Sequence, residues 1–155
     1  MRNSQTQSFK PFDASDWRIG IVVSQFNRQI TERLYRSVMD RTKAYNLPAN
    51  KIDSLKVAGS IEIPLALQKM ALSQRYRALV ALGCVIRGET AHFDYVCKFV
   101  TEGILRVQLD NQVPIAFGIL TCDTEEQAKS RADSGGDFLD AAMDLAYRIR
   151  QFDNS

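Results

Sequence analysis

Short apolar runs alternate with amphipathic stretches along most of this chain. Four of the runs are rich in β-branched or other apolar residues and are too short for buried helices, so they predict strands. These runs span residues 18–26, 52–57, 78–85 and 113–120. The second run alternates only partly, whereas the first and third read as strands buried on both faces.

The stretches that follow the runs carry apolar residues at helical spacing. They predict helices over about 30–45, 61–73, 91–109, 124–132 and 137–152, and the glycines of DSGG (133–136) separate the last two. Strands that alternate with helices imply a parallel sheet covered on both faces. We expect residues 1–16 to form a flexible arm and residues 17–155 a single domain.

The unusual residues follow the strands. In open parallel sheets, ligands bind beyond the carboxyl ends of the strands. Here those ends carry Phe26-Asn27, AGSIEIP (58–64), VIRGETAH (85–92) and FGILTCDT (117–124). Four marked segments that converge on one edge predict a ligand pocket there.

The segment RGETAH carries the most chemistry. Gly88 allows close backbone approach to a ligand, and Thr90 is a candidate N-cap. The start of the following helix then favours an anion such as phosphate. His92, the only histidine, would lie in the first turn, where it could exchange a proton near neutral pH. The alternatives are a simple capped turn and an exposed histidine without a role.

Four further side chains have both a structural and a functional reading. Glu62 is either a first-turn acid that complements the helix dipole or a hydrogen-bond acceptor for a polar substrate. Phe26 and Phe117 either pack in the core or stack on a planar ring. Arg131 either complements a helix C-terminus or binds phosphate.

The composition narrows the class of protein. An apolar fraction of 45%, a charged fraction of 25% and a net charge of +2 are ordinary for a soluble domain, and without a basic block neither nucleic acid nor an anionic membrane is the expected partner. Cys84, Cys97 and Cys122 have no metal or disulfide spacing and are expected to be buried thiols. The polar N-terminus and the lack of long apolar runs predict a cytoplasmic protein.

The segment ALGCVIRGETAHFDYV (81–96) resembles the signature of the 6,7-dimethyl-8-ribityllumazine synthase family. The segments FN (26–27), EIPLA (62–66), VPIAFGILTCDTEEQA (113–128) and Arg131 follow in family order, so the resemblance runs from about residue 17 to 150. It implies a flavodoxin-like three-layer α/β/α sandwich with a four-stranded parallel sheet. It also implies homopentamers with active sites shared between neighbours, no metal or cofactor, and riboflavin synthase as a possible partner.

The implied reaction condenses 5-amino-6-(ribitylamino)uracil with 3,4-dihydroxy-2-butanone 4-phosphate, and it releases phosphate and water. The resemblance implies that His92 transfers protons and that Arg131, from an adjacent subunit, binds phosphate. The remaining implied contacts are with the pyrimidine (Phe26, Val85, Ile86), with the ribityl chain (Ser60, Ile61, Glu62), and with phosphate (Gly88, Glu89, Thr90). Asn27 and Phe117, the latter from the adjacent subunit, are further implied substrate-binding residues.

The chain departs from the family pattern in three respects. Ala58 and Ala91 stand where the family usually has proline, and Ile61 where it often has an aromatic residue. The family's Lys-Gly pair is missing from 133–140, and Asp137 lies near the lysine position. This loss motivates an alternative hypothesis, a binding or scaffold protein with weakened catalysis. A flavin-carrying electron-transfer protein is a third reading, on fold analogy alone.

Overall fold

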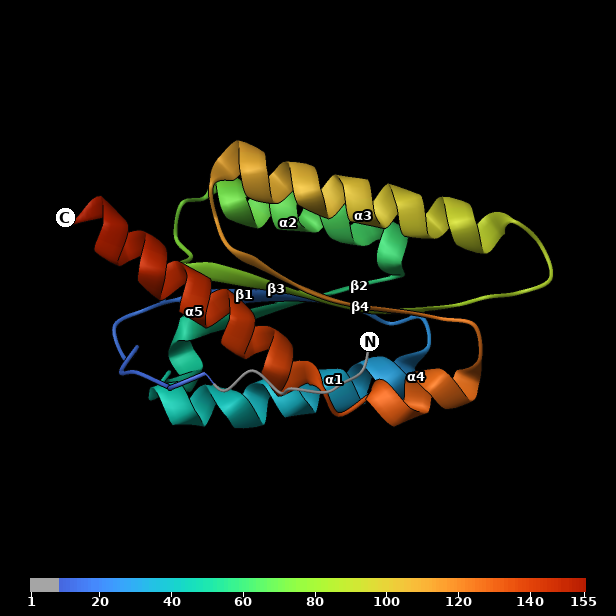
Figure 1. The fold of residues 1–155 in the computed structure, drawn as a ribbon, viewed down its shortest axis with the longest axis horizontal. Coiled ribbons are helices and arrows are strands. Elements are labelled where there is room, and N and C mark those ends of the chain that lie inside the picture. The colour runs from blue at the N-terminus through green and yellow to red at the C-terminus, as the bar shows by residue number, and fades with distance from the viewer. Residues whose placement is uncertain (1–8) are drawn as a thin grey trace.

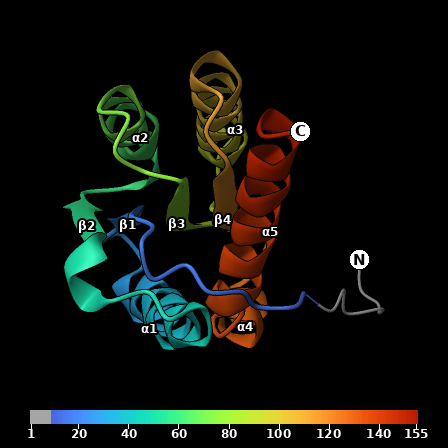
Figure 2. The same ribbon diagram turned by 90° about the vertical axis from the view of Figure 1, so that its left-hand side faces the viewer.

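The computed structural model describes residues 9–155, in which a parallel sheet lies between two layers of helices (Figure 1). The strands β1 (Ile19–Ser24), β2 (Ile52–Val57), β3 (Ala78–Ile86) and β4 (Ile115–Cys122) are ordered β2-β1-β3-β4. The helices are α1 (Arg28–Thr42), α2 (Ile63–Leu72), α3 (His92–Asn111), α4 (Glu125–Arg131) and α5 (Gly135–Asp153). Figure 2 shows α2 and α3 on one face of the sheet and α1, α4 and α5 on the other. The predicted three-layer α/β/α sandwich is confirmed.

The central strands are buried on both faces and the edge strands are not. All six residues of β1 and the first seven of β3 are buried, because helices cover both sides of them. The edge strand β2 is only partly buried, and β4 exposes Phe117 and Thr121 on one face. Side chains of alternate parity form two cores, one under α1 and α5 and one under α2 and α3.

The last helix begins two residues earlier than predicted, at Gly135 instead of Asp137. The two glycines were read as a helix break, but they are the first two residues of α5. A Cβ on Gly135 would lie 2.1 Å from the carbonyl oxygen of Leu34, so the start of α5 packs directly on the backbone of α1. The glycine allows this close approach, which outweighs its low helix propensity.

The described part of the predicted arm, residues 9–16, packs on the domain. Ala14 is fully buried, and its N–H donates to the carbonyl of Tyr45 over 2.8 Å. The ring of Phe12 lies 5.1 Å from that of Trp17 and 4.8 Å from that of Tyr147, centroid to centroid. This apolar clustering holds the segment in place. Residues 1–8 of the predicted arm lie outside the described residues.

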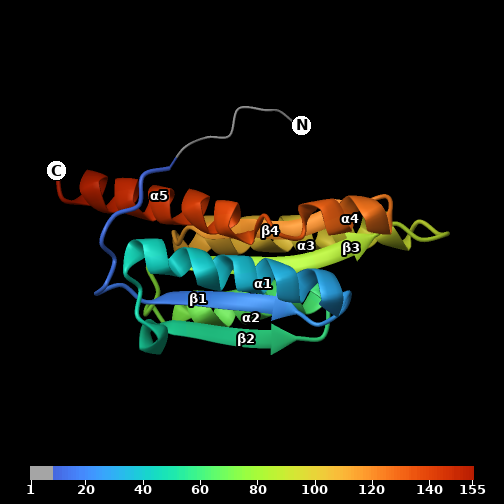
Figure 3. The same ribbon diagram turned by 90° about the horizontal axis from the view of Figure 1, so that it is seen from below.

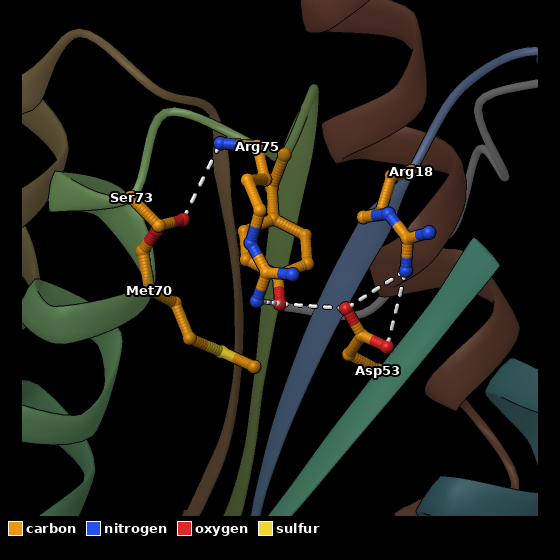
Figure 4. A network of polar contacts seen from close by, with 6 residues as sticks. Arg18, Asp53, Met70, Ser73 and Arg75 are labelled. Carbon is orange, nitrogen blue, oxygen red and sulfur yellow. Dashed lines mark hydrogen bonds and ion pairs between the residues drawn. The ribbon is translucent and has the colours of Figure 1, made fainter.

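A network of polar contacts joins the amino ends of the strands (Figure 4). Arg18, just before β1, donates from Nη1 to both carboxylate oxygens of Asp53 on β2, over 3.2 and 3.0 Å. The hydroxyl of Tyr76 donates to Asp53 over 2.7 Å and accepts from Arg75 over 3.1 Å. The hydrogen bond from Tyr76, together with Arg18, holds the pKa of Asp53 below its usual range. The charged groups of this network are thus paired with other groups of the same chain.

Candidate active site

The opposite, carboxyl edge of the sheet holds a cavity of about 460 Å³. The parallel strands all end at this edge, toward which the β3–α3 loop extends (Figure 3). The strand order reverses between β1 and β3, and such a switch point is where open sheets bind ligands. The cavity is lined by residues that follow β1 and β2, by the last three residues of β3, and by the loop and helix after it: Phe26, Gly59, Ser60, Ile61, Glu62, Cys84, Val85, Ile86, Gly88, Thr90, His92, Phe93 and Val96.

The turn after β1 presents an aromatic ring at the cavity. Phe26 is 70% exposed, so its ring does not pack in the core. Its N–H donates to the carbonyl of Ala58 over 3.0 Å. Asn27 has a left-handed backbone (φ 59°, ψ 48°), and its side-chain Nδ2 donates to the carbonyl of Cys84 over 2.8 Å. This bond bridges β1 and β3 at the switch point and fixes the turn that carries Phe26.

The turn after β2 forms a polar wall of the cavity. Residues Ser60–Glu62 make a 3₁₀ turn that leads into α2, so the α-helix starts at Ile63. The Glu62 carboxylate accepts the N–H of Gly59 through Oε1 over 2.9 Å, a local structural bond that the sequence pattern did not predict. Ser60 is 6% exposed and lies above Gly83 on β3, where a Cβ would come within 2.7 Å of its Oγ. Gly83 therefore makes room for the Ser60 hydroxyl.

The loop after β3 leads into the N-terminus of the 20-residue helix α3. Thr90 is not the N-cap as predicted: Ala91 occupies that position, and the Thr90 hydroxyl accepts the N–H of His92 over 3.3 Å. A Cβ on Gly88 would meet no atom within 4 Å, and its backbone is not left-handed. Neither packing nor backbone conformation within the chain therefore requires a glycine at position 88. Close approach of a ligand to the backbone is a reason for glycine that fits both observations.

His92 is the first residue of α3, is exposed, and lines the cavity. Its predicted place in the first turn is confirmed. The N-terminus of a long helix concentrates free N–H groups and about half a positive charge, which attracts anions. The structure thus brings an imidazole and an anion-favouring helix end to the same cavity as the aromatic and polar turns.

The sequence pattern predicts no role for Arg87 of the RGET segment, and the structure gives it one. Its Nε donates to Asp123 over 2.8 Å, its Nη1 lies 3.4 Å from Asp94, and its guanidinium lies 4.4 Å from the centroid of the Phe93 ring. These contacts tie the loop after β3 to the loop after β4 and to α3. Sequence reasoning missed them because Asp123 lies 36 residues away.

The cysteines differ from one another. Cys84 and Cys122 are buried, as expected, but Cys97 is only partly buried. Burial raises the pKa of the Cys84 thiol to about 12, so this cavity-lining residue is a core hydrophobe and not a nucleophile.

Four predicted site residues do not line the cavity. Asn27 acts through its bond to Cys84, and Glu89 is exposed outside the lining. Phe117 is 40% exposed on β4, and Arg131 ends α4, on the sheet face opposite α3 (Figure 2). The Arg131 Nη1 donates to the carbonyl of Gln127 over 2.9 Å, so its guanidinium lies along its own helix.

Comparison with known proteins assigns this arrangement to a family. A family model described as 6,7-dimethyl-8-ribityllumazine synthase matches residues 16–150. Proteins of that name from the Coxiella burnetii strains Dugway 5J108-111, CbuG_Q212 and RSA 493 (Nine Mile phase I) are 43% identical over 144 residues, which cover 90% of this chain and 95% of each relative. This chain belongs to the lumazine synthase family.

Family membership confirms several predictions from the sequence. The fold is flavodoxin-like, and the activity is the condensation that makes 6,7-dimethyl-8-ribityllumazine in riboflavin biosynthesis. The chain is thus a transferase of the lumazine synthase type. Across residues 9–155, the helices lack either the length or the apolar character needed to cross a membrane.

Proposed function

We propose that the cavity at the carboxyl edge is the place where this lumazine synthase condenses 5-amino-6-(ribitylamino)uracil with 3,4-dihydroxy-2-butanone 4-phosphate. One observation carries the proposal: an exposed aromatic ring, a polar turn, and a helix N-terminus with a histidine surround a single cavity of about 460 Å³. Each group matches one part of the two substrates. The ring faces the pyrimidine, the turn the ribityl chain, and the helix end the phosphate.

The pyrimidine and its side chain occupy the end formed by the first two turns. Phe26 stacks on the ring, as an exposed aromatic side chain can, while Val85 and Ile86 contact the pyrimidine through their backbone. The ribityl hydroxyls bond to the turn of Ser60, Ile61 and Glu62, whose side chains line the cavity. Asn27 contributes indirectly, because its amide fixes the turn that presents Phe26.

The phosphate lies at the start of α3, against Gly88, Glu89 and Thr90. The helix dipole and the first-turn N–H groups supply the attraction. The open space at Gly88 supports close approach of the phosphate to the backbone. Arg87 supports the same loop, because its guanidinium lies 3.4 Å from Asp94 and offsets part of the repulsion between that first-turn carboxylate and an anion.

His92 moves protons while the bound substrates do the bond making. The amine of the pyrimidine attacks the ketone, and loss of water gives a Schiff base. Loss of a proton from the hydroxyl-bearing carbon next to the imine gives an enamine, which expels phosphate from the terminal carbon. The enol that results becomes a ketone at the hydroxyl-bearing carbon, and attack of the ribityl-bearing nitrogen on this new carbonyl closes the ring with loss of a second water. The nucleophile belongs to the substrate, so the protein supplies position, an anion site and a proton carrier.

Assembly completes the site in this proposal. Phe117 and Arg131 lie outside the cavity of their own chain, so they serve the cavity of a neighbouring subunit in a homopentamer. The outer surface of α2 and α3 supports self-association, because it exposes Leu65, Leu72, Phe99, Leu105 and Leu109. Cytoplasmic location and association with riboflavin synthase are further parts of the proposal.

Light scattering on a size-exclusion column tests the assembly. A mass of about five chains is the expected result for a single pentamer, and multiples of it are expected for larger shells. A monomer that turns over both substrates would contradict the shared site.

The role of His92 is tested with His92→Ala. Purified protein and both substrates are mixed, and lumazine formation is followed by absorbance. We expect His92→Ala to slow turnover about 10- to 100-fold without abolishing it, because positioning persists when the proton carrier is lost. An unchanged rate would remove His92 from the mechanism, and a wild-type rate no higher than that of the uncatalysed condensation would sink the assigned site.

A further inference from the structure

We propose that Arg33 and Ser37 on α1 are positioning residues for Arg131, because they clamp the α4–α5 junction to α1. The inference rests on the proposed role of Arg131 as the cationic phosphate ligand of a neighbouring subunit. It concerns the segment in which the family's usual lysine is missing and aspartates stand instead.

The first contact of the clamp is an ion pair of favourable geometry. Arg33 donates from Nε to Oδ1 of Asp133 over 3.1 Å and from Nη2 to Oδ2 over 2.7 Å. Exposed ion pairs contribute little to stability, but a bidentate guanidinium–carboxylate pair fixes orientation. The hydrogen bond from Arg33 also holds the pKa of Asp133 below its ordinary value. This pair therefore sets where the junction lies more than how stable the fold is.

The second contact is the hydroxyl of Ser37, which bonds the junction twice. It donates to the carbonyl of Asp133 over 2.9 Å and accepts the N–H of Gly136 over 2.9 Å. Gly136 lies in the first turn of α5, so Ser37 satisfies from α1 an N–H that a cap would otherwise satisfy. The N-cap residue Ser134 makes no side-chain cap bond to α5.

Ser134 instead carries the clamp to Arg131. Its hydroxyl donates to the carbonyl of Arg131 over 2.6 Å, and its N–H donates to the same oxygen over 3.2 Å. The adjacent Gly135 packs on the carbonyl of Leu34. The backbone of Arg131 is thus connected through Ser134 to a helix start that has one fixed position on α1.

The clamp also removes a charge that would oppose phosphate binding. Asp133 is two residues from Arg131, and an unpaired carboxylate there would weaken the attraction of a guanidinium for an anion. Arg33 neutralises it. In a chain without the family's lysine, Arg131 provides a larger share of the positive charge that binds phosphate. Both its position and the charge around it depend on α1.

Steady-state kinetics on the intact protein test the clamp, with each substrate varied in turn. Arg33→Gln should raise the KM for the ketose phosphate roughly 3- to 10-fold, with kcat within about 2-fold and the KM for the pyrimidine unchanged. Exchanging the partners, Arg33→Asp with Asp133→Arg, should restore the KM for the ketose phosphate to within about 2-fold of wild type. Arg148→Gln is the matched control, since it breaks an exposed arginine–aspartate pair that lies within α5 alone. It should leave all constants unchanged.

Hydrogen exchange of the junction amides supplies a readout that does not depend on turnover. Faster exchange at residues 134–136 is expected in Arg33→Gln and Ser37→Ala, and not in Arg148→Gln. Wild-type constants in Arg33→Gln, or an equal rise in both KM values, would overturn the clamp while the proposed function stands. A wild-type protein without turnover would overturn the proposed function, and the catalytic role of the clamp with it.

Discussion

The two edges of the sheet differ in what they leave open to a ligand. At the amino edge, Arg18, Asp53 and Tyr76 bond to one another and leave little capacity for a ligand. At the carboxyl edge, Phe26 and His92 are exposed and Gly88 faces open space. The amino-edge groups therefore hold the fold, whereas the carboxyl edge leaves an aromatic ring, an imidazole and open space available to a ligand. Mutations at the two edges should therefore affect different measurements.

The largest difference between the effect on catalysis and the effect on stability is expected for a mutation of Arg131. Arg131→Gln should lower kcat/KM about 10- to 100-fold, because loss of a charge-assisted hydrogen bond to phosphate costs about 1.5–3 kcal/mol. The melting temperature should stay within about 2 °C, since Arg131 is exposed and bonds mainly to its own helix. Kinetics and a thermal melt on one preparation check both statements. A large drop in melting temperature with normal kinetics would reverse the assignment of this residue.

At the amino edge, Asp53→Asn should give the reverse result. Tyr76 and Arg18 lose a charged acceptor, at a cost of about 1 kcal/mol because the group is partly exposed. The melting temperature should fall by roughly 2–4 °C, with turnover at 25 °C unchanged. Glu32→Gln is a suitable control, since it breaks an exposed pair within α1. A catalytic defect in Asp53→Asn would show that the edges are coupled.

A smaller effect with opposite signs is expected for Gly88→Ala. The new methyl group meets no atom within 4 Å, so the chain should become more stable by about 0.4–1 kcal/mol through a less flexible unfolded state. The same methyl group would stand where the phosphate approaches, so the KM for the ketose phosphate should rise several-fold. Chemical denaturation and kinetics measure the two signs. A gain in stability without a change in KM would argue against a phosphate at this loop.

The smallest predicted effect is in the pH dependence of stability. The pKa of Asp53 is lowered in the folded protein, by Tyr76 first and by Arg18 as well. Its contribution to stability is therefore complete above the pKa of the unfolded chain and is lost as pH falls through the folded pKa. The gap in unfolding free energy between wild type and Asp53→Asn should shrink from pH 7 to about pH 3. A constant gap would mean that the Asp53 charge has no part in it.

Local pattern predicted much of the fold. The run 52–57 matches β2 at both ends, and the helix predicted from about 91 begins one residue later, at His92. The start of α5 was missed because Gly135 packs on the backbone of Leu34, which lies about a hundred residues earlier in the chain. The packing of Phe12 and Ala14 was missed because a polar segment gave no sign of its aromatic neighbours.

The convergence of the strand ends could be predicted because parallel topology brings them together. The ion pair that holds the α4–α5 junction on α1 could not be predicted, because Arg33 and Asp133 are 100 residues apart and neither has a local pattern. Phe117 and Arg131 lie outside the cavity of their own chain, so the fold of one chain does not explain their predicted place in the site. The order of strands and helices thus predicts where the site lies, whereas contacts between residues far apart in the sequence cannot be predicted in this way.

Gly83 lies where the core and the cavity meet. A side chain there would come within 2.7 Å of the Ser60 hydroxyl and within 3.2 Å of the methyl groups of Ile63 and Ile119. A larger residue at this position is therefore opposed twice, once because it disturbs the packing of the core and once because it changes the shape of the cavity. A change at one of the three neighbours leaves the other two close contacts in place, so a larger residue at position 83 requires coordinated changes in both the core and the cavity wall.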